Sequence, residues 1–124
     1  MQHAKIENMI LDYGGFHDCI VEGIWIDNFN KRIELSLEDL NQCLCDSDGI
    51  VRKARLVFQD VTEFRINAFS SSGLIAIYAV DYFPLSSSLR FEIAWSTNRH
   101  NPEYGSYEKW VVECMDVKLE TVLP

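Results

Sequence analysis

The sequence has no long hydrophobic run and few motifs that carry chemistry. Its longest apolar stretch, LIAIYAV from Leu74 to Val80, is strand-sized and far below the roughly 18 residues that a membrane helix needs. The N-terminus lacks the sustained apolar segment of a secretory signal, so we expect a cytoplasmic protein. A Gly-rich phosphate loop and the G-x-S-x-G motif of serine hydrolases are also missing.

Basic residues are scarce. The chain has 11 Lys and Arg residues against 19 Asp and Glu residues, which gives a formal net charge of -8. A protein of that charge repels nucleic acid and anionic membranes at long range and attracts basic partners. The same balance also keeps a small domain in solution, which is the simpler explanation. We therefore expect a protein partner of basic character, with no nucleic acid and no membrane.

Cysteine motifs for metal or redox chemistry are missing as well, although the chain has four cysteines. Cys43 and Cys45 form C-x-C, not the C-x-x-C spacing that suits zinc and redox sites. The D-S-D-G run that follows places Leu44 where a calcium loop needs an oxygen ligand. We expect reduced cysteines, with Cys19 and Cys114 buried in apolar strands, and no metal or other cofactor.

What the sequence does have is alternation with a period of two. Residues 32–38 show it most clearly, since Ile33, Leu35 and Leu37 alternate with charged and polar residues. Similar runs recur at short spacing, and no amphipathic helix separates them. This pattern predicts a mainly β fold: one domain over residues 1–124, an antiparallel β-sandwich or partly open barrel of about seven strands.

Several elements can be predicted individually. Ile6, Met9 and Ile10 share one helical stripe, which indicates a short N-terminal helix. Residues 17–27 and 31–40 predict a hairpin, with a bulge or close approach at Gly23. We expect residues 61–69 to form a strand and residues 74–82 to form a central strand buried on both faces. Residues 107–120 change phase midway, which predicts one strand with a bulge.

The adjacent pair His17-Asp18 stands just ahead of the first predicted strand. It resembles the histidine-aspartate pair of metal-dependent phosphohydrolases, but those enzymes hold the pair in a helical domain with further ligands. The only other histidines here are His3 and His100. We therefore interpret the pair as structural, with Asp18 bonded to the strand entrance and His17 donating to a backbone carbonyl. No catalytic residue is predicted.

Two polar regions are candidates for binding a partner. The segment from residue 99 to residue 110 combines Arg, Tyr and Trp side chains, which are common in binding hot spots. Its tyrosines can equally anchor a long loop onto the sheet. The predicted hairpin and the loop after it gather carboxylates near one end of the domain. The candidate binding residues are Glu38, Asp39, Asp46, Asp48, Arg99, His100, Tyr104 and Tyr107.

Four segments, FHDCIVEGIWID, KRIELSLEDL, LVFQDVTEFRINAF and GLIAIYAVDY, carry a family resemblance. Together they look like a group of small bacterial proteins, some assigned as immunity proteins of polymorphic toxin systems. The shared pattern is a histidine-aspartate pair ahead of an alternating strand, followed by Phe-x-x-Val, here Phe58 to Val61. The resemblance covers Phe16 to Tyr82. It implies a mostly β domain without known catalysis and a protein partner that is neutralised by binding, and it assigns no functional residue.

These observations lead to three hypotheses. The first is a non-enzymatic cytosolic protein-binding domain, an immunity-like inhibitor whose acidic face attracts a basic partner. The second is a small-molecule-binding or hydrolytic β-barrel with His17 and His100 at a cavity. The third is a structural homodimer that assembles through an exposed strand edge.

Overall fold

A computed structural model describes residues 3–39, 53–66, 75–96 and 108–122. The chain begins with helix α1 (His3–Asp12) and the 3-10 helix η1 (Gly14–Phe16). Eight strands follow in these residues: β1 (Ile20–Asp27), β2 (Arg32–Glu38), β3 (Lys53–Gln59), β4 (Glu63–Arg65), β5 (Ala76–Pro84), β6 (Leu89–Ser96), β7 (Glu108–Cys114) and β8 (Asp116–Val122). They form one open antiparallel sheet in the order β4-β7-β6-β5-β1-β2-β3-β8. The predicted mainly β fold with a short N-terminal helix is confirmed.

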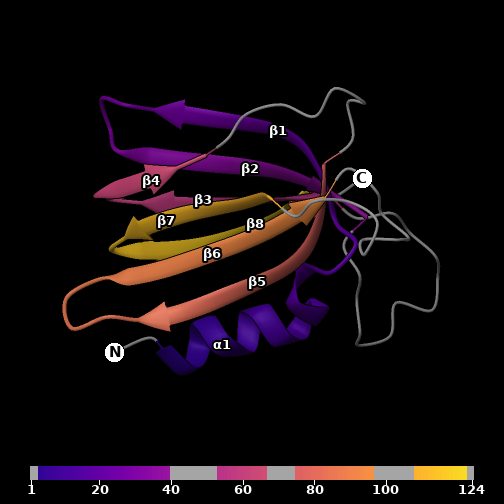
Figure 1. The fold of residues 1–124 in the computed structure, drawn as a ribbon, viewed down its shortest axis with the longest axis horizontal. Coiled ribbons are helices and arrows are strands. Elements are labelled where there is room, and N and C mark those ends of the chain that lie inside the picture. The colour runs from indigo at the N-terminus through magenta and orange to yellow at the C-terminus, as the bar shows by residue number, and fades with distance from the viewer. Residues whose placement is uncertain (1–2, 40–52, 67–74, 97–107, 123–124) are drawn as a thin grey trace.

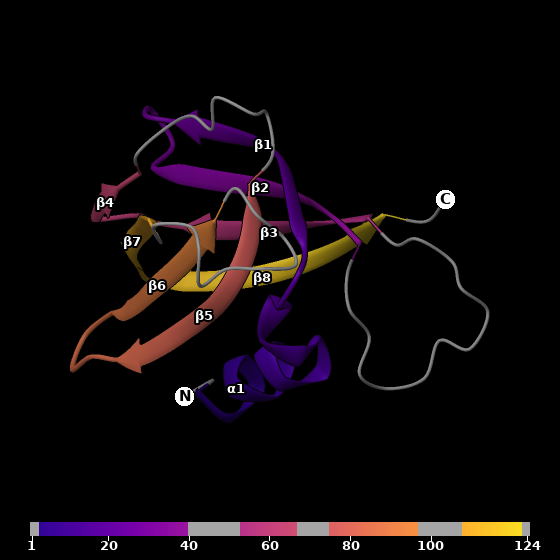
Figure 2. The same ribbon diagram turned by 45° about the vertical axis from the view of Figure 1, so that its right-hand side comes forward.

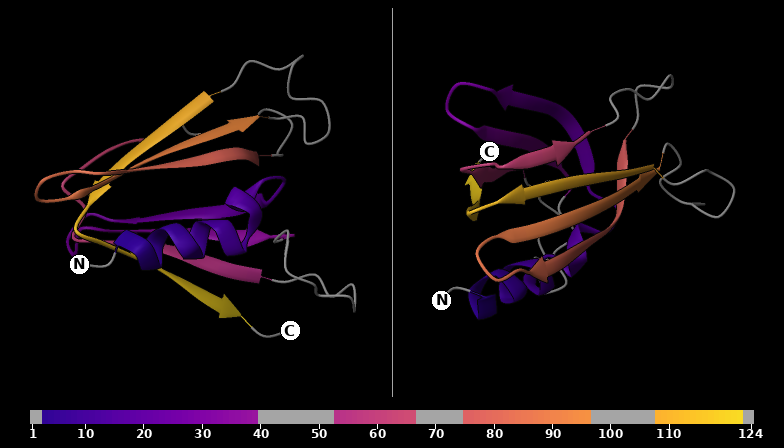
Figure 3. Two further views of the ribbon diagram at one scale, coloured as in Figure 1. Left: turned by 90° about the horizontal axis from the view of Figure 1, so that it is seen from below. Right: turned by 60° about the vertical axis from the view of Figure 1, so that its left-hand side comes forward.

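The sheet folds over at the boundary between β5 and β1. These two strands share one register pair, Ile20 with Ala76. The Asp18 N–H also donates to the Ile77 carbonyl at 2.9 Å, and the Ile77 N–H donates to the Cys19 carbonyl at 2.8 Å. Beyond this corner the strands separate into two layers that face each other (Figure 1 and Figure 3). We call β1-β2-β3-β8 the first half-sheet and β4-β7-β6-β5 the second half-sheet.

The hydrophobic core lies between the two half-sheets, where alternate strand residues point inward. In β2, the three apolar residues from Ile33 to Leu37 are buried and the residues between them are partly exposed. Phe58 of the first half-sheet meets Phe91 of the second, with ring centroids 5.3 Å apart. Helix α1 lies beside β5 and contributes Ile6 to the core (Figure 2). The alternation in the sequence therefore indicates which side of each strand faces the other half-sheet.

β1 and β2 form the predicted hairpin. Their register shifts between Val21 and Gly23, so the bulge predicted at Gly23 is confirmed. A bulge inserts one extra residue, so the inward side changes from Val21 to Ile24, which packs against the core. Trp25 is left on the outer face with 67% of its surface exposed.

The prediction for residues 74–82 is confirmed in part, because β5 is a strand at the centre of the sheet order, but the predicted burial of both faces is wrong. Ala76 and Ile77 at the start of β5 (Ala76–Pro84) are both buried, but from Tyr78 onward only one face is buried, and Tyr78, Asp81 and Phe83 are exposed. A strand is buried on both faces only when other elements cover both sides of the sheet. Among the described residues, no helix or strand covers the outer side of the second half-sheet beyond the start of β5. The uninterrupted apolar run is therefore not evidence that both faces of the strand are buried.

The predictions for two other strands also need correction. Residues 107–120 contain two strands, not one bulged strand, because the chain breaks at Met115 and β7 and β8 join different half-sheets. The Met115 N–H donates to the Gln59 carbonyl of β3 at 3.1 Å. This bond holds the chain where its pairing changes from β6 to β3. Of residues 61–69, only Glu63–Arg65 is a strand within the described part, and residues 67–69 lie outside it.

Candidate functional site

His17 and Asp18 occupy the two central positions of a β-turn. The Cys19 N–H donates to the Phe16 carbonyl at 3.1 Å. His17 has φ -59° and ψ 133°, and Asp18 has φ 67°, which are the dihedral angles of a type II turn. The backbone N–H of Asp18 then bonds to Ile77 of β5. The pair thus reverses the chain between η1 and β1 and attaches it to the corner of the sheet.

The His17 side chain supports the same turn. His17 Nδ1 lies 2.8 Å from the Tyr78 carbonyl oxygen, so Nδ1 carries the proton and donates it, as the sequence-based interpretation predicts. His17 Nε2 lies 3.6 Å from Asp18 Oδ2. Among the described residues, no group of three His, Cys, Asp or Glu side chains is placed to hold a metal ion.

Of the eight predicted binding residues, the structure describes Glu38 and Asp39. Both lie at the end of β2, opposite the start of β1. Glu38 receives a bond from Lys53 Nζ at 2.9 Å, and Glu22 lies 3.8 Å from the same nitrogen. The remaining six candidates, Asp46, Asp48, Arg99, His100, Tyr104 and Tyr107, lie outside the described residues.

Lys53 partly neutralises these carboxylates. Its hydrogen bond lowers the pKa of Glu38, and the bond to Glu38 in turn raises the pKa of Lys53. Desolvation, followed by its contacts with Glu38, raises the pKa of Glu22. Among the described residues, one cation thus pairs with two carboxylates at this end of β2.

A second surface, formed by exposed apolar side chains near the β1–β2 turn, was not predicted from the sequence. Phe29 is 92% exposed and Trp25 is 67% exposed. Ile26 and Phe64 are also exposed large hydrophobic residues. We call Trp25, Ile26, Phe29 and Phe64 the hairpin surface, which includes both sides of the hairpin because the adjacent residues Trp25 and Ile26 point to opposite faces of β1. The one available signal was the aromatic residue within the polar turn D-N-F-N, because a turn phenylalanine has no face of a strand on which to be buried.

The turn that carries Phe29 is held by Asp27. Asp27 Oδ1 accepts bonds from the backbone N–H groups of Phe29 at 3.1 Å and Asn30 at 3.0 Å, and Oδ2 accepts from Asn30 Nδ2 at 2.9 Å. These bonds, those from Asn30 foremost, lower the pKa of the Asp27 carboxyl. The Lys31 carbonyl accepts a bond from the Val61 N–H at 2.8 Å. Phe29 is therefore presented on a turn that is fixed at both sides.

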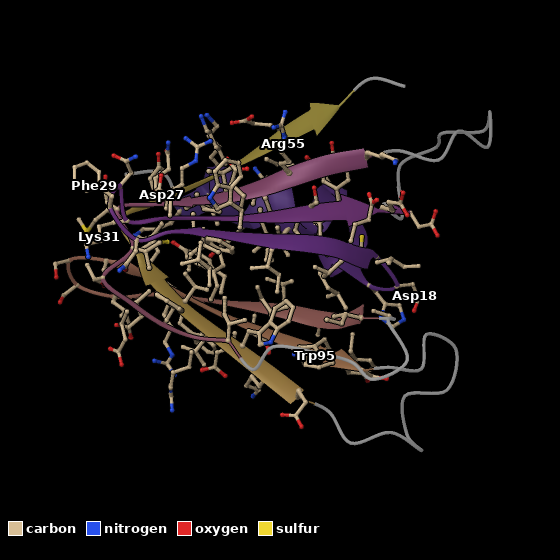
Figure 4. The ribbon with its side chains drawn as sticks, turned by 90° about the horizontal axis from the view of Figure 1, so that it is seen from above. Asp18, Asp27, Phe29, Lys31, Arg55 and Trp95 are labelled. Carbon is tan, nitrogen blue, oxygen red and sulfur yellow. The ribbon has the colours of Figure 1, made fainter. Side chains whose placement is uncertain are left out.

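Figure 4 places this turn in the whole molecule. Phe29, Asp27 and Lys31 lie together at one end of the strands, and Asp18 lies at the opposite end. The hairpin surface and the acidic end of β2 are therefore separate regions of the molecule.

Two shallow recesses flank the hairpin. One, of about 160 Å³, lies between Ile26 and Phe64, where the hairpin meets the segment from Val61 to Phe64. The other, of about 240 Å³, is bordered by Trp25 and Arg32. Small-molecule sites usually enclose about 300–1,000 Å³. Both recesses fall below that range, so this end of the molecule is better suited to receive protruding side chains of a protein.

The sequence matches no protein-family model, and no match was found among curated proteins or solved structures. Within the described ranges, no helix has the length and apolar character needed to cross a membrane. Among the described residues, the exposed aromatic side chains of the hairpin surface are the feature that most favours binding.

Proposed function

We propose that this chain is a non-enzymatic cytosolic protein-binding domain, and that the hairpin surface contacts its partner. The observation that carries the proposal is Phe29, an almost fully exposed aromatic ring on a turn fixed by three hydrogen bonds to Asp27. Removing such a side chain from water contributes about 1.5–3 kcal/mol. A partner that covers Phe29 gains this free energy without having to order the turn.

The recess beside the turn that carries Phe29 supports the proposal, because the turn residues Asp27 and Asn30 also line it. Trp25 and Arg32 border the same recess, and Trp and Arg are enriched among residues that dominate binding energy. Arg32 is held in place by Glu34, with Nη2 2.6 Å and Nε 3.0 Å from the same carboxylate oxygen. A side chain already fixed in this way loses less conformational freedom when a partner binds.

Charge supports a basic partner. The net charge of -8 favours fast association with a positively charged protein, and the acidic end of β2 adds local attraction. The resemblance to immunity proteins suggests the class of partner: we propose a basic toxin that is neutralised when it is bound. Glu38 and Asp39, with the acidic residues of the segment after β2, are the proposed source of this attraction.

The described residues do not favour the hydrolytic alternative. That hypothesis requires His17 and His100 at one cavity, and His100 lies outside the described residues. His17 already uses Nδ1 to hold the turn at the corner of the sheet. The structure therefore gives His17 a structural role that does not need a substrate.

The proposal can be tested by affinity capture from a lysate of the source organism. The baits are the tagged wild-type protein, the double variant Trp25→Ser/Phe29→Ser, and Leu11→Ser as a matched control. Leu11 is 70% exposed on α1, so its replacement also removes an exposed apolar side chain but leaves the hairpin intact. Each capture is made at low and at moderate salt, and thermal melting confirms that the variants are folded.

We expect the wild type and the Leu11 variant to capture one stoichiometric basic protein, and the hairpin variant to lose it. The captured amount should fall as salt rises, because screening weakens long-range attraction. Equal capture by the hairpin variant would remove the hairpin surface from the proposal. If no bait recovers any protein other than itself, the protein-binding function is wrong.

A further inference from the structure

Strand β8 forms one end of the sheet. Its inner neighbour is β3, to which it is paired from Lys53 opposite Val122 to Gln59 opposite Asp116. Among the described residues, no strand pairs with its other edge. An unpaired edge presents a row of backbone N–H and C=O groups that can bond to another strand.

The bonding pattern shows which groups face outward. The Val117 N–H donates to Asp116 Oδ1 at 2.9 Å, so it does not point toward β3. Backbone groups of an antiparallel strand alternate between its two edges. The groups of Leu119 and of residue 121 therefore share the free edge with those of Val117. At the first of these positions, the Val117 N–H bonds to a side chain of its own strand.

The free edge also has space beside it. A groove of about 780 Å³ runs between α1 and β8. Met9 of α1 and Tyr13, directly after the helix, line one side, and Val117 and Leu119 of β8 line the other. Its apolar floor and its strand edge together suit an extended chain whose alternate side chains turn inward.

The charged side chains of β8 favour a particular strand, in a particular register, as its partner at the free edge. Lys118 Nζ and Glu120 Oε1 are 3.1 Å apart, and both side chains are partly exposed. Suppose a second β8 runs antiparallel, with the two-fold axis at Leu119. Each Lys118 then lies opposite the Glu120 of the other copy, and all seven residues of β8 overlap. An axis at Lys118 or at Glu120 places like charges opposite each other, which is unfavourable.

We propose that β8 pairs with the β8 of a second copy of this chain, in antiparallel orientation about Leu119. The resulting interface is isologous, and it joins the first half-sheets of both copies into one continuous sheet. The Leu119 N–H and carbonyl of each copy bond to those of the other. Val117 exchanges its bond to Asp116 for one to the partner strand. No residue of the hairpin surface takes part, so this inference stands independently of the proposed function.

The experiment is sedimentation velocity over a series of dilutions, with charge variants of β8. Lys118→Glu and Glu120→Lys each place like charges opposite one another at two symmetric positions. We expect each to raise the dimer dissociation constant about tenfold. The double variant Lys118→Glu/Glu120→Lys restores opposite charges with their order reversed, and it should dimerise like the wild type.

Lys109→Glu is the matched control. Lys109 Nζ pairs with Glu92 Oε1 at 3.1 Å on the outer side of the second half-sheet, so this variant makes the same change of charge away from β8. It should dimerise like the wild type. A wild-type protein that is monomeric at every concentration overturns the proposal, and that measurement needs no variant. The proposal also fails if the double variant stays as weak as the single variants, or if Lys109→Glu weakens the dimer equally.

Discussion

At the scale of the residue, backbone conformation explains most of what the polar turns do. Among the described residues, five that are not glycine have positive φ: Phe16, Asp18, Lys31, Asp39 and Asp60. Such conformations cost roughly 1 kcal/mol or more for residues with a Cβ, and aspartate tolerates them better than most. Phe16 ends η1, and the other four lie just before, after or between strands. Asp18 is thus explained by geometry, which the sequence could suggest only through its position ahead of a strand.

This account of Asp18 predicts opposite responses to two substitutions. Asp18→Gly should leave the free energy of unfolding within about 0.5 kcal/mol of the wild type, because glycine adopts φ 67° without strain. Asp18→Val should lower it by about 1–2 kcal/mol, because a β-branched side chain clashes in the left-handed region. Urea unfolding measures both.

Asp81→Val is the matched control for this pair. Asp81 is exposed in β5 and has an ordinary strand conformation. Valine suits strands, so this variant should lose no stability. A glycine variant of Asp18 that is as unstable as the valine variant would contradict the turn account and give the carboxylate itself a structural role.

At the scale of the element, alternation predicts strands well and their partners poorly. The β1–β2 hairpin, the Gly23 bulge and the buried faces of β2 and β6 follow directly from side-chain spacing. The break at Met115 does not, because a phase switch looks the same whether the strand bulges or leaves for another neighbour. The exposure of β5 was also missed, since apolar residues such as Tyr78 and Phe83 remain on an uncovered outer face.

Each half-sheet has a buried valine on its outer face. Val57 is fully buried although it is not part of the core cluster, and Val111 is 8% exposed. Val57 lies in register between Glu34 and Lys118. Long charged side chains cover apolar surface with their methylene groups while their charged ends stay in water. These ladders of charged residues therefore shield the backs of the strands from water.

This shielding makes Val57 as important to stability as a core residue. Val57→Ala should lower the free energy of unfolding by about 1.5–2.5 kcal/mol, because two buried methyl groups are lost. Val112→Ala is the matched control, since Val112 is 1% exposed within the core cluster. Urea unfolding should give similar losses for both. A loss below about 0.5 kcal/mol for Val57→Ala is typical of a surface site. It would show that the charged side chains over Val57 do not exclude water.

At the scale of the whole molecule, the candidate site was the least predictable feature. The His17-Asp18 turn could be interpreted from two adjacent residues. The hairpin surface could not, because it combines β1, its turn and β4, and Phe64 lies 35 positions beyond Phe29 in the sequence. Single-sequence alternation assigned Trp25 and Ile26 to strand faces, and burial on those faces was the natural expectation. Only the folded arrangement shows that the end of the hairpin extends beyond the core.

The two half-sheets are linked at Cys114, and this thiol connects the stability of the whole molecule to pH. Cys114 is fully buried at the end of β7, opposite Leu89. Burial raises its pKa from 9.0 to about 12, although a backbone hydrogen bond from Asp116 acts in the opposite sense. The unfolded chain therefore releases this proton at lower pH than the folded protein does. The stabilisation is fully present below pH 9 and is lost as the pH rises toward 12.

Replacing the thiol should remove this dependence. From the shift in pKa, wild-type protein loses about 2 kcal/mol of stability through Cys114 between pH 8 and pH 11. Cys114→Val keeps an apolar side chain of similar size but has no proton to release. Its urea unfolding curve should therefore move less than that of the wild type over the same interval. Tyr82 is present in both proteins; its pKa is raised mainly by burial and only then by the charges of Glu7 and Cys114, so most of its contribution cancels in the comparison. Equal losses would mean that Cys114 does not ionise on unfolding in this interval, and that other groups cause the alkaline loss.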